Sequence, residues 1–496
     1  MCHAVLHRVA LFVIALGAGL SPSGAQAQVG APVDLTALTS RPLAEMVAEL
    51  PGRGMALAEL LPVALDRSLP IAAARVRRRL SEAGVEIESG DFDPALELEA
   101  GLAKSRQFGG RSDAYRVGLG QVLPWGTAVG VELLGGRAPS TLGGAYDADV
   151  GVTLSQPLLE GFGTRNTGLR VARFGDQASV QRLTRATTLV VASVELAYGD
   201  LAEAEAIEAV LQRSWEISQA LLFRNEQLAE RQLVAEVDVI TARSAVALRR
   251  STLVTARRDR GNASDALAFL VWGEDAVRVL ARDTLLLKTV PLEVQLPVAP
   301  GFAEAEATAL SRRADVLAKQ LDLRGAEVSA DDANNARLPS LSLDGGLRSG
   351  GTDLSFGSSL GSLDQGWSWS LGLAFSQPLG NRRDRGRDQT AEWLRELRRL
   401  EVVLTENSVG REVREAVRGI RAGMERVEAA EEAAALASAQ LEAERGRLDL
   451  GLGDSFRLLE TDENAVQAEL EYVRARYDLA RAGTLYRLAS GEVPGA

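Results

Sequence analysis

Cysteine and histidine are almost missing from this sequence of 496 residues. Its one cysteine and two histidines, Cys2, His3 and His7, all precede the first apolar run. Removal of a secretory signal peptide would take all three away. The exported chain then has no disulfide, no thiolate or imidazole metal site, and no Ser-His-Asp or Cys-His catalytic group. We therefore expect no enzymatic activity, no cofactor and no metal. The lack of cysteine and histidine does not exclude enzymes whose catalytic groups are carboxylates only.

Residues 1–27 have the features of such a signal peptide. A basic start up to Arg8 is followed by an apolar run at 9–20 and by Ala-Gln-Ala at 25–27, after which we expect cleavage. A short membrane anchor is less favoured, because twelve apolar positions are fewer than the roughly 20 that span a bilayer. Cys2 precedes the apolar run instead of following it, so no lipid anchor is predicted.

The sequence also has few prolines, a negative net charge and no further long hydrophobic run. No proline lies within 158–231 or 379–493, so very long helices are allowed. No later stretch approaches about 18 uninterrupted apolar residues, so a membrane crossing would have to use strands. The net charge is −12, or −13 (54 basic minus 67 acidic) without the signal peptide and its one arginine. An anionic protein argues against nucleic acid as a partner.

The chain contains an internal repeat. The tetrapeptide Ser-Gln-Pro-Leu at 155–158 recurs at 376–379, 221 positions later, and the segment 232–240 corresponds to 451–459 at an offset of 219. Agreement between separate correspondences in the same order indicates duplication of one unit. The predicted domains are listed here: signal peptide 1–27; N-terminal extension 28–55; first repeat 56–274, with a helix at 56–92, barrel strands at 93–157 and long helices at 158–274; extended linker 275–301; and second repeat 302–491, with a helix at 302–337, barrel strands at 338–378 and long helices at 379–491.

One segment of the second repeat alternates strictly between large apolar and small or polar residues. The apolar positions are Trp367, Trp369, Leu371, Leu373 and Phe375. A strand of about 10 residues with one apolar face is typical of a membrane barrel, and we expect these five side chains to face lipid. A soluble β-sandwich would show the same alternation, and the strands alone do not decide between the two.

Three further segments alternate in the same way, at 96–102, 150–154 and 341–347, which gives four clear strands per chain. Closed membrane barrels begin at about eight strands and an open sheet edge is not tolerated in lipid, so several chains must share a barrel. Two additional alternating segments, at 115–119 and 129–133, either join the barrel or project from it.

The proline-free segments predict long antiparallel helices. Alanine and leucine recur at helical spacing in 429–448 and 466–479, with glutamate and arginine between them, which is typical of coiled-coil packing. Each helix pair is expected to turn back near 232–236 and 450–454. The predicted fold is therefore mainly α, with long antiparallel coiled-coil helices, an internal duplication and a membrane β-barrel.

At this point the sequence resembles the TolC outer-membrane efflux family. The most specific residues are SQPLLEGFG at 155–163, SQPLGNRR at 376–383, and the Leu-Val-Ala-x-x-Asp-Val run at 233–239, within a similarity that covers about 55–491. The resemblance implies a homotrimer that shares one 12-stranded barrel in outer-membrane lipid and continues as a helical tunnel in the periplasm. It also implies a passive exit duct that works with a periplasmic adaptor (membrane fusion) protein and an inner-membrane transporter of RND, ABC or similar type.

The resemblance places the functional residues at the helix turns. The expected periplasmic aperture consists of Arg457, Glu460, Asp238 and Asp454, and the expected adaptor-contact tip consists of Gln232, Leu233, Val234, Gly451, Leu452 and Gly453. Arg457 stands where the family often has an acid, and its i, i+3 spacing to Glu460 suggests an ion pair between subunits that latches the closed tip. A solvated helix face is the equally weighted alternative. Gln232 stands where the second repeat has Gly451, which suggests that the first turn is built differently.

Two other function classes compete with the export duct. A periplasmic coiled-coil scaffold without a channel accounts for the helices but not for the strands. An exported enzyme that uses carboxylates would need a compact acidic pocket, and no group of acids in the sequence converges on one. The sequence does not identify the exported substrate.

Overall fold

A computed structural model describes residues 54–104, 111–137, 145–280, 287–290, 300–361, 366–450 and 452–492. The chain divides into two units, Met1–Pro51 and Gly52–Ala496, and all the described residues belong to the second. The predicted signal peptide, nearly all of the N-terminal extension, most of the linker and Gly451 lie outside the described residues.

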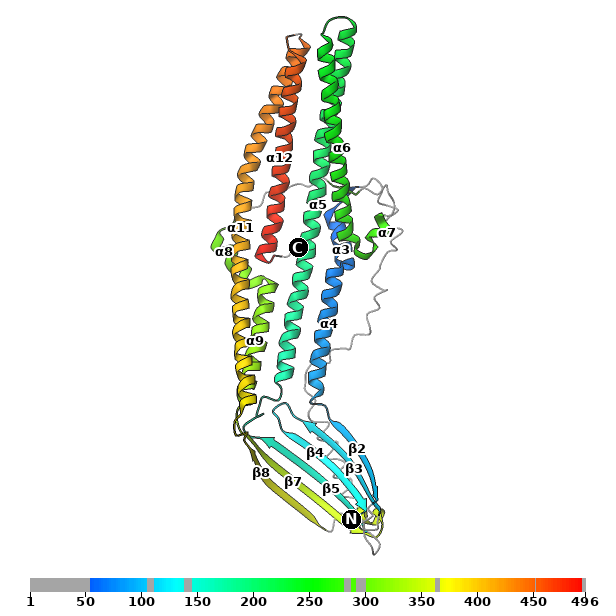
Figure 1. Cartoon of the computed structure of the whole chain (residues 1–496), viewed down its shortest axis with the longest axis vertical. Coiled ribbons are helices and arrows are strands. Elements are labelled where there is room, and N and C mark those ends of the chain that lie inside the picture. Colours follow the sequence, from blue (N-terminus) through cyan, green and yellow to red (C-terminus); the bar gives the residue numbers. More distant parts are fainter. Residues whose placement is uncertain are drawn as a thin grey trace. The chain divides into compact units, whose positions relative to one another are not determined.

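The two repeats share one order of elements, a pair of shorter helices, then strands, then a pair of long helices, but the first has four strands and the second has two, with α10 between them (Figure 1). The first consists of α3 (Leu57–Arg67), α4 (Leu69–Gly90), β2 (Ala95–Lys104), β3 (Arg111–Val122), β4 (Ala128–Arg137), β5 (Tyr146–Pro157), α5 (Thr167–Glu230) and α6 (Glu236–Trp272), followed by η1 (Gly273–Asp275) and α7 (Ala276–Leu280). The second consists of α8 (Phe302–Arg312), α9 (Ala314–Asn335), β7 (Ser340–Asp353), α10 (Phe356–Gly361), β8 (Trp367–Ser376), α11 (Arg382–Asp449) and α12 (Ser455–Ser490). A short parallel pair joins β1 (Gly54–Met55) to β6 (Lys288–Thr289).

The segments 56–92 and 302–337, each predicted as one helix, are two helices apiece. The first is interrupted at Ser68 and the second at Arg313, both with extended backbone (ψ 118° and 124°). Pro70 follows the first break and cannot donate a backbone hydrogen bond, so it favours a new helix start. The second break has no proline. There the Arg313 guanidinium binds Asp315 at 2.6 Å and Glu412 of α11 at 2.5 Å, which fixes the chain at this point.

Each break packs against the glycine that ends the long helix of its own repeat. Gly273, with φ 52°, follows α6, and a Cβ at this position would lie 2.4 Å from the Arg67 carbonyl oxygen. Gly491, with φ 79°, follows α12, and a Cβ there would lie 3.1 Å from the Arg313 nitrogen. Glycine is needed at both positions because the backbone is left-handed and the neighbouring backbone is close. The duplication thus extends to the way each repeat closes.

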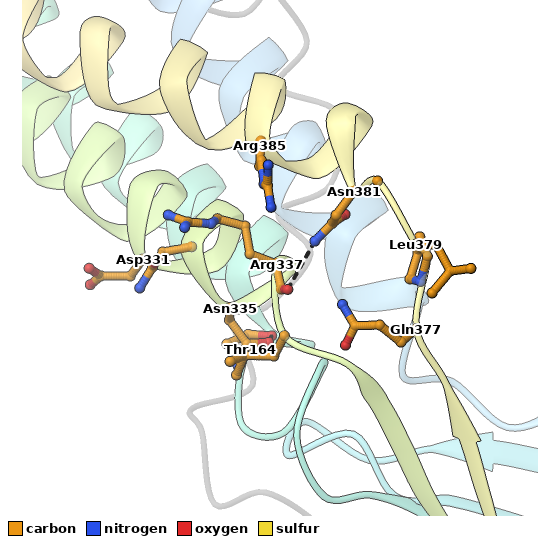
Figure 2. Close-up of a pocket in the computed structure, with 12 residues that line it drawn as sticks. Thr164, Asp331, Asn335, Arg337, Gln377, Leu379, Asn381 and Arg385 are labelled. Atoms are coloured by element: carbon orange, nitrogen blue, oxygen red, sulfur yellow. Dashed lines mark hydrogen bonds between the residues drawn. The ribbon is translucent and has the colours of Figure 1, made fainter.

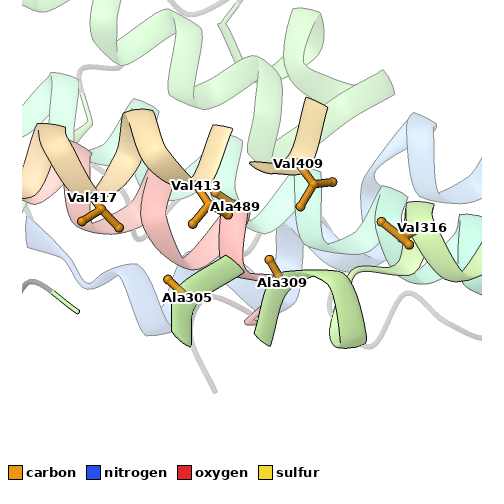
Figure 3. Close-up of a cluster of buried hydrophobic side chains, with 7 residues drawn as sticks. All are labelled: Ala305, Ala309, Val316, Val409, Val413, Val417 and Ala489. Carbon is orange, nitrogen blue, oxygen red and sulfur yellow. The ribbon is translucent and has the colours of Figure 1, made fainter. Parts of the chain in front are cut away.

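The long helices pack as antiparallel pairs, α5 with α6 and α11 with α12, and α5 also contacts α4, α9 and α12. Figure 3 shows one core cluster, in which Val409, Val413 and Val417 form a stripe along α11. The i, i+4 spacing places these side chains on one face, where they meet small residues of α8 and α12. Burial of each valine contributes about 2 kcal/mol. Within the described residues, none of the helices has the length and apolarity needed to cross a membrane.

The strands form one antiparallel sheet in the order β2-β3-β4-β5-β7-β8 (Figure 1). The strand predicted from its alternation at 367–376 is confirmed as β8. The two additional alternating segments are β3 and β4, and they lie in the sheet between β2 and β5. The two strands that were clear in the first repeat, β2 and β5, are therefore not neighbours. The described sheet has six strands, whereas the sequence showed four clear ones.

Candidate functional site

The two long helical hairpins turn back through similar motifs. After α5 the Leu233 amide donates to the Leu228 carbonyl at 2.9 Å, and after α11 the Leu452 amide donates to the Arg447 carbonyl at 2.9 Å. This bond across five residues is typical of a helix end whose next residue has positive φ. Gln232 fills that position in the first turn with φ 60°. The closing hydrogen bond is therefore the same in both turns, although Gln232 corresponds to Gly451 of the second repeat.

The two turns differ two residues after the position of Gln232. A Cβ at Gly453 would lie 2.7 Å from the Leu448 nitrogen, so the second turn passes too close to its helix for a side chain. The corresponding residue of the first turn, at the same offset of 219, is Val234. The conformation of the second turn therefore requires a residue without a side chain at Gly453.

Two of the predicted aperture acids cap helices. The Ala235 amide donates to Asp238 Oδ2 at 3.3 Å at the start of α6, and the Phe456 amide donates to Asp454 Oδ1 at 3.1 Å at the start of α12. Carboxylates at helix N-termini satisfy free amides and interact favourably with the helix dipole. Asp238 and Asp454 thus have a structural role at the turns, whatever else they face.

The other two predicted aperture residues do not pair with each other in this chain. Arg457 Nε lies 3.5 Å from Glu444 Oε1 of α11, and that carboxylate is nearly buried. Glu460 is exposed and has no ion pair among the described residues. The i, i+3 spacing therefore does not bring Arg457 and Glu460 together within one copy, and pairing between copies stays a prediction.

Apolar side chains are exposed at both turns. Leu233 and Leu452 are 67% and 72% exposed, and Val237 and Phe456 are both 62% exposed. The offset of 219 relates Leu233 to Leu452 and Val237 to Phe456, so both repeats present the same pair of apolar positions. Exposed apolar groups that recur at equivalent places are typical of contact surfaces.

A buried ion pair links the two helical hairpins. Arg249 of α6 and Asp462 of α12 approach to 2.8 Å, and their side chains are only 8% and 2% exposed. Ser214 of α5 accepts from Arg249 Nε at 2.9 Å and donates to Asp462 at 3.3 Å, and Arg445 of α11 lies 3.9 Å from the same carboxylate. All four long helices therefore contribute to this cluster.

The burial of Asp462 has an electrostatic cost. Loss of water raises the pKa of this carboxyl, and the nearby Arg249 and Arg445 charges oppose the shift. Among the described residues, Asp462 Oδ1 has no hydrogen-bond partner. Sequence analysis missed this cluster, because Arg249 and Asp462 look like any other charge on an alternating helix. No local signal in the sequence would have shown that they meet.

The end of α9 holds both loops that follow the Ser-Gln-Pro-Leu motifs. Asn335 Oδ1 accepts from the Gly161 amide at 2.8 Å and from Thr164 Oγ1 at 3.3 Å, which fixes the first loop. Asn381 Nδ2 donates to the Arg337 carbonyl at 3.0 Å, which fixes the second loop. Thr164, Asn335, Arg337 and Asn381 line one pocket (Figure 2), and its volume is about 750 Å³. The repeated motif therefore marks the place where strands are anchored to helices.

The five side chains predicted to face lipid lie on one face of β8 and are 66–71% exposed: Trp367, Trp369, Leu371, Leu373 and Phe375. The opposite face of the sheet is polar. There Arg348 of β7 forms an ion pair with Glu132 of β4 at 2.8 Å, across β5. The sheet therefore separates an apolar surface from a charged one.

Comparison with known proteins gives a family match. The profile described as outer membrane efflux protein matches residues 60–271 and 307–491. The matched segments include both helix turns and all six strands of the antiparallel sheet. No curated protein matches the sequence significantly.

Solved structures share the fold at low identity. The CmeC outer membrane channel of Campylobacter jejuni is similar at 18% identity, over 88% of this chain and 85% of that chain, with a TM-score of 0.62. The open state of the MtrE outer membrane channel of Neisseria gonorrhoeae is similar at 19% identity, over 88% and 89%, with a TM-score of 0.63. The outer membrane protein VceC of Vibrio cholerae is similar at 18% identity, over 88% and 96%, with a TM-score of 0.63.

Replacement of Gln232 by glycine should stabilise the first turn by about 1 kcal/mol, because positive φ is strained for a residue with a Cβ. Hydrogen exchange of the Leu233 amide should slow by about fivefold. As an opposite control, Gly453→Ala should speed exchange of the Leu452 amide, because the new Cβ meets the Leu448 backbone. Unchanged Leu233 exchange in Gln232→Gly would show that the turn carries no strain.

Replacement of Asp462 by asparagine keeps the side-chain shape and leaves the buried Arg249 charge with only the exposed Glu463 carboxylate, 3.7 Å away, as a counter-charge. We expect a loss of about 3 kcal/mol in the free energy of unfolding. The matched control is Glu469→Gln, which breaks an exposed pair with Arg213 that also joins α12 to α5, at 3.0 Å. That change should cost less than about 1 kcal/mol. Urea unfolding in detergent measures both, and equal losses would contradict the assigned role of Asp462.

Proposed function

The chain belongs to the outer membrane efflux protein family, and on this premise we propose that it is the passive exit duct of a tripartite efflux or type I secretion system. Membership implies an outer-membrane location, in a family made up of channel proteins. The proposal includes export by the signal peptide at 1–27, no lipid anchor and no catalytic step. Transport energy then comes from an inner-membrane transporter that this chain does not contain.

The observation that carries the proposal is the sheet. Its apolar face is exposed, and among the described residues β2 and β8 each pair on one side only. Six strands are fewer than the roughly eight that close a membrane barrel, and unpaired strand edges are not tolerated in lipid. Several copies must therefore complete the barrel, and the family resemblance makes that assembly a homotrimer.

The partners are a periplasmic adaptor and an inner-membrane transporter of RND, ABC or similar type. The exposed apolar pairs Leu233 with Val237 and Leu452 with Phe456 support docking of the adaptor at the helix turns. Because duplication gives each chain two equivalent surfaces, a trimer presents six of them. Gln232, Val234, Gly451 and Gly453 belong to the same proposed contact tip.

The aperture is proposed at the same turns. Arg457 is paired with Glu444 in its own chain, and Glu460 is exposed nearby on α12. A ring of three Glu460 carboxylates would attract cations and repel itself, which favours an opening tip. If Arg457 exchanges Glu444 for Glu460 of a neighbouring copy, the closed tip is latched.

A periplasmic coiled-coil scaffold is the second candidate. It would have to expose the apolar face of the sheet, including two tryptophans on β8, to water. An exposed apolar surface of this extent marks an interaction with membrane or protein. The sheet therefore favours the duct over the scaffold.

Extraction and conductance test the proposed duct. The mature protein should need detergent, have the native mass of a trimer, and give discrete cation-preferring conductance in a planar bilayer because its proposed aperture is acidic. Native mass spectrometry and single-channel recording measure this. A water-soluble monomer or dimer without conductance would support the scaffold and reject the duct.

Replacement of Val237 and Phe456 together by serine should weaken adaptor binding at least about tenfold. Each chain then loses two apolar contacts, one at each turn, and each contact contributes about 1 kcal/mol or more. Titration against a purified adaptor of the same organism measures the affinity. The matched control is Leu248→Ser with Leu436→Ser, which changes side chains that are similarly exposed (65% and 64%) but lie away from the turns. Equal affinity of both double variants would move the docking surface elsewhere.

A further inference from the structure

The strands β3 and β4 are full members of the sheet. They form a hairpin through Gly126, which has φ 101°, with a 2.8 Å bond from the Leu123 amide to the Thr127 carbonyl. On one side β3 pairs with β2 from Gly120 to Arg111, and on the other β4 pairs with β5 from Ala128 to Arg137. The hairpin therefore separates the two strands of the first repeat that were identified first in the sequence.

The apolar face of the sheet continues through this hairpin. One row of directly opposite residues crosses all six strands with apolar residues only: Leu96, Leu119, Val131, Val152, Leu347 and Trp369. In the next apolar row β3 and β4 contribute Val117 and Leu133. A hairpin that projected into water would not need its apolar residues in register with those of the lipid-facing strands.

The polar face continues through the hairpin as well. The neighbouring row contains Glu97, Gly118, Glu132, Gly151, Arg348 and Ser368. Arg348 reaches Glu132 over Gly151, where a Cβ would lie only 3.4 Å from the Glu132 side chain and 3.6 Å from that of Arg348. The pair thus connects the hairpin to the second repeat on the side away from the apolar face. Charges of this kind are expected on the water-filled side of a barrel.

We propose that all six strands of each chain form the barrel wall, so that three copies close an 18-stranded barrel in place of the 12-stranded one that the family resemblance implies. This inference rests on the proposed trimeric duct. The partner of each free edge is a second copy of the chain, with β8 of one copy beside β2 of the next. Since the sheet has an even number of antiparallel strands, β8 runs opposite to β2 and the new contact is antiparallel like the others.

A wider barrel changes where the duct can select its cargo. Barrel diameter grows roughly in proportion to strand number, so eighteen strands give about 1.5 times the diameter of twelve, and barrels of about this size leave an aqueous channel. The membrane section would then admit bulky hydrated solutes or polypeptide segments. Selection and closure are left to the helix turns.

Distance measurement between copies tests the strand number. With strands about 4.8 Å apart and tilted by about 40°, the barrel diameter is about 36 Å for eighteen strands and about 24 Å for twelve. In a trimer, the Trp369→Cys positions of two copies should therefore lie about 31 Å apart in an eighteen-stranded barrel and about 21 Å apart in a twelve-stranded one. A spin label that points outward lengthens both distances by the same amount. Pulsed electron paramagnetic resonance in nanodiscs resolves the two, and the shorter distance would overturn the inference.

Thiol accessibility tests the hairpin directly, because Cys2 is the only cysteine and lies in the predicted signal peptide. In nanodiscs, a membrane-impermeant maleimide should label Val131→Cys and Trp369→Cys at least about tenfold more slowly than Leu134→Cys on the opposite face of β4, because lipid excludes the reagent. If Val131→Cys is labelled rapidly while Trp369→Cys is protected, the hairpin lies outside the wall and only this inference fails. Rapid labelling of both would reject the membrane barrel itself.

Discussion

The need to pair every backbone amide and carbonyl determines the organisation of this protein. A strand edge is satisfied by water at a membrane surface, but not inside lipid. The described sheet exposes apolar side chains such as Trp369 and Leu98 along one face, and its outer strands, β2 and β8, each lack a partner on one side. A single copy therefore cannot occupy a bilayer. For the proposed duct, assembly with other copies is therefore a condition of the fold as much as of the function.

The helices follow from the same duplication that produced the sheet. Strands β5 and β8 each lead into a helix of more than 60 residues, α5 with 64 and α11 with 68. At about 1.5 Å per residue, each reaches on the order of 100 Å from the strand that precedes it. Asn335 and Asn381 fix the two junctions through backbone hydrogen bonds. Both junctions between a strand and a long helix are therefore anchored near the end of α9.

Local patterns in the sequence predicted most of the fold. The strand at 367–376 and the long helices were visible because each has a regular period of apolar residues, and the turns were visible because the repeat aligned them. Contacts between distant segments were not visible. Arg249 and Asp462 are separated by 213 positions, and only the relative rotation of α6 and α12 brings them together. The membership of β3 and β4 in the sheet likewise depends on pairing, which alternation alone does not specify.

The long helices are held differently in the middle and near the turns. Along α11 the stripe of Val409, Val413 and Val417 is fully buried against small side chains, and such packing has few alternative arrangements. Near the turns the helices meet through charged groups, among them the pair of Arg224 with Asp449 at 2.7 Å and that of Arg457 with Glu444. An ion pair contributes little net stability and its members can exchange partners of similar charge. The end that is proposed to open is therefore held in part by ion pairs that can exchange partners, beside the smaller buried apolar contacts of Leu221, Ala242 and Leu458.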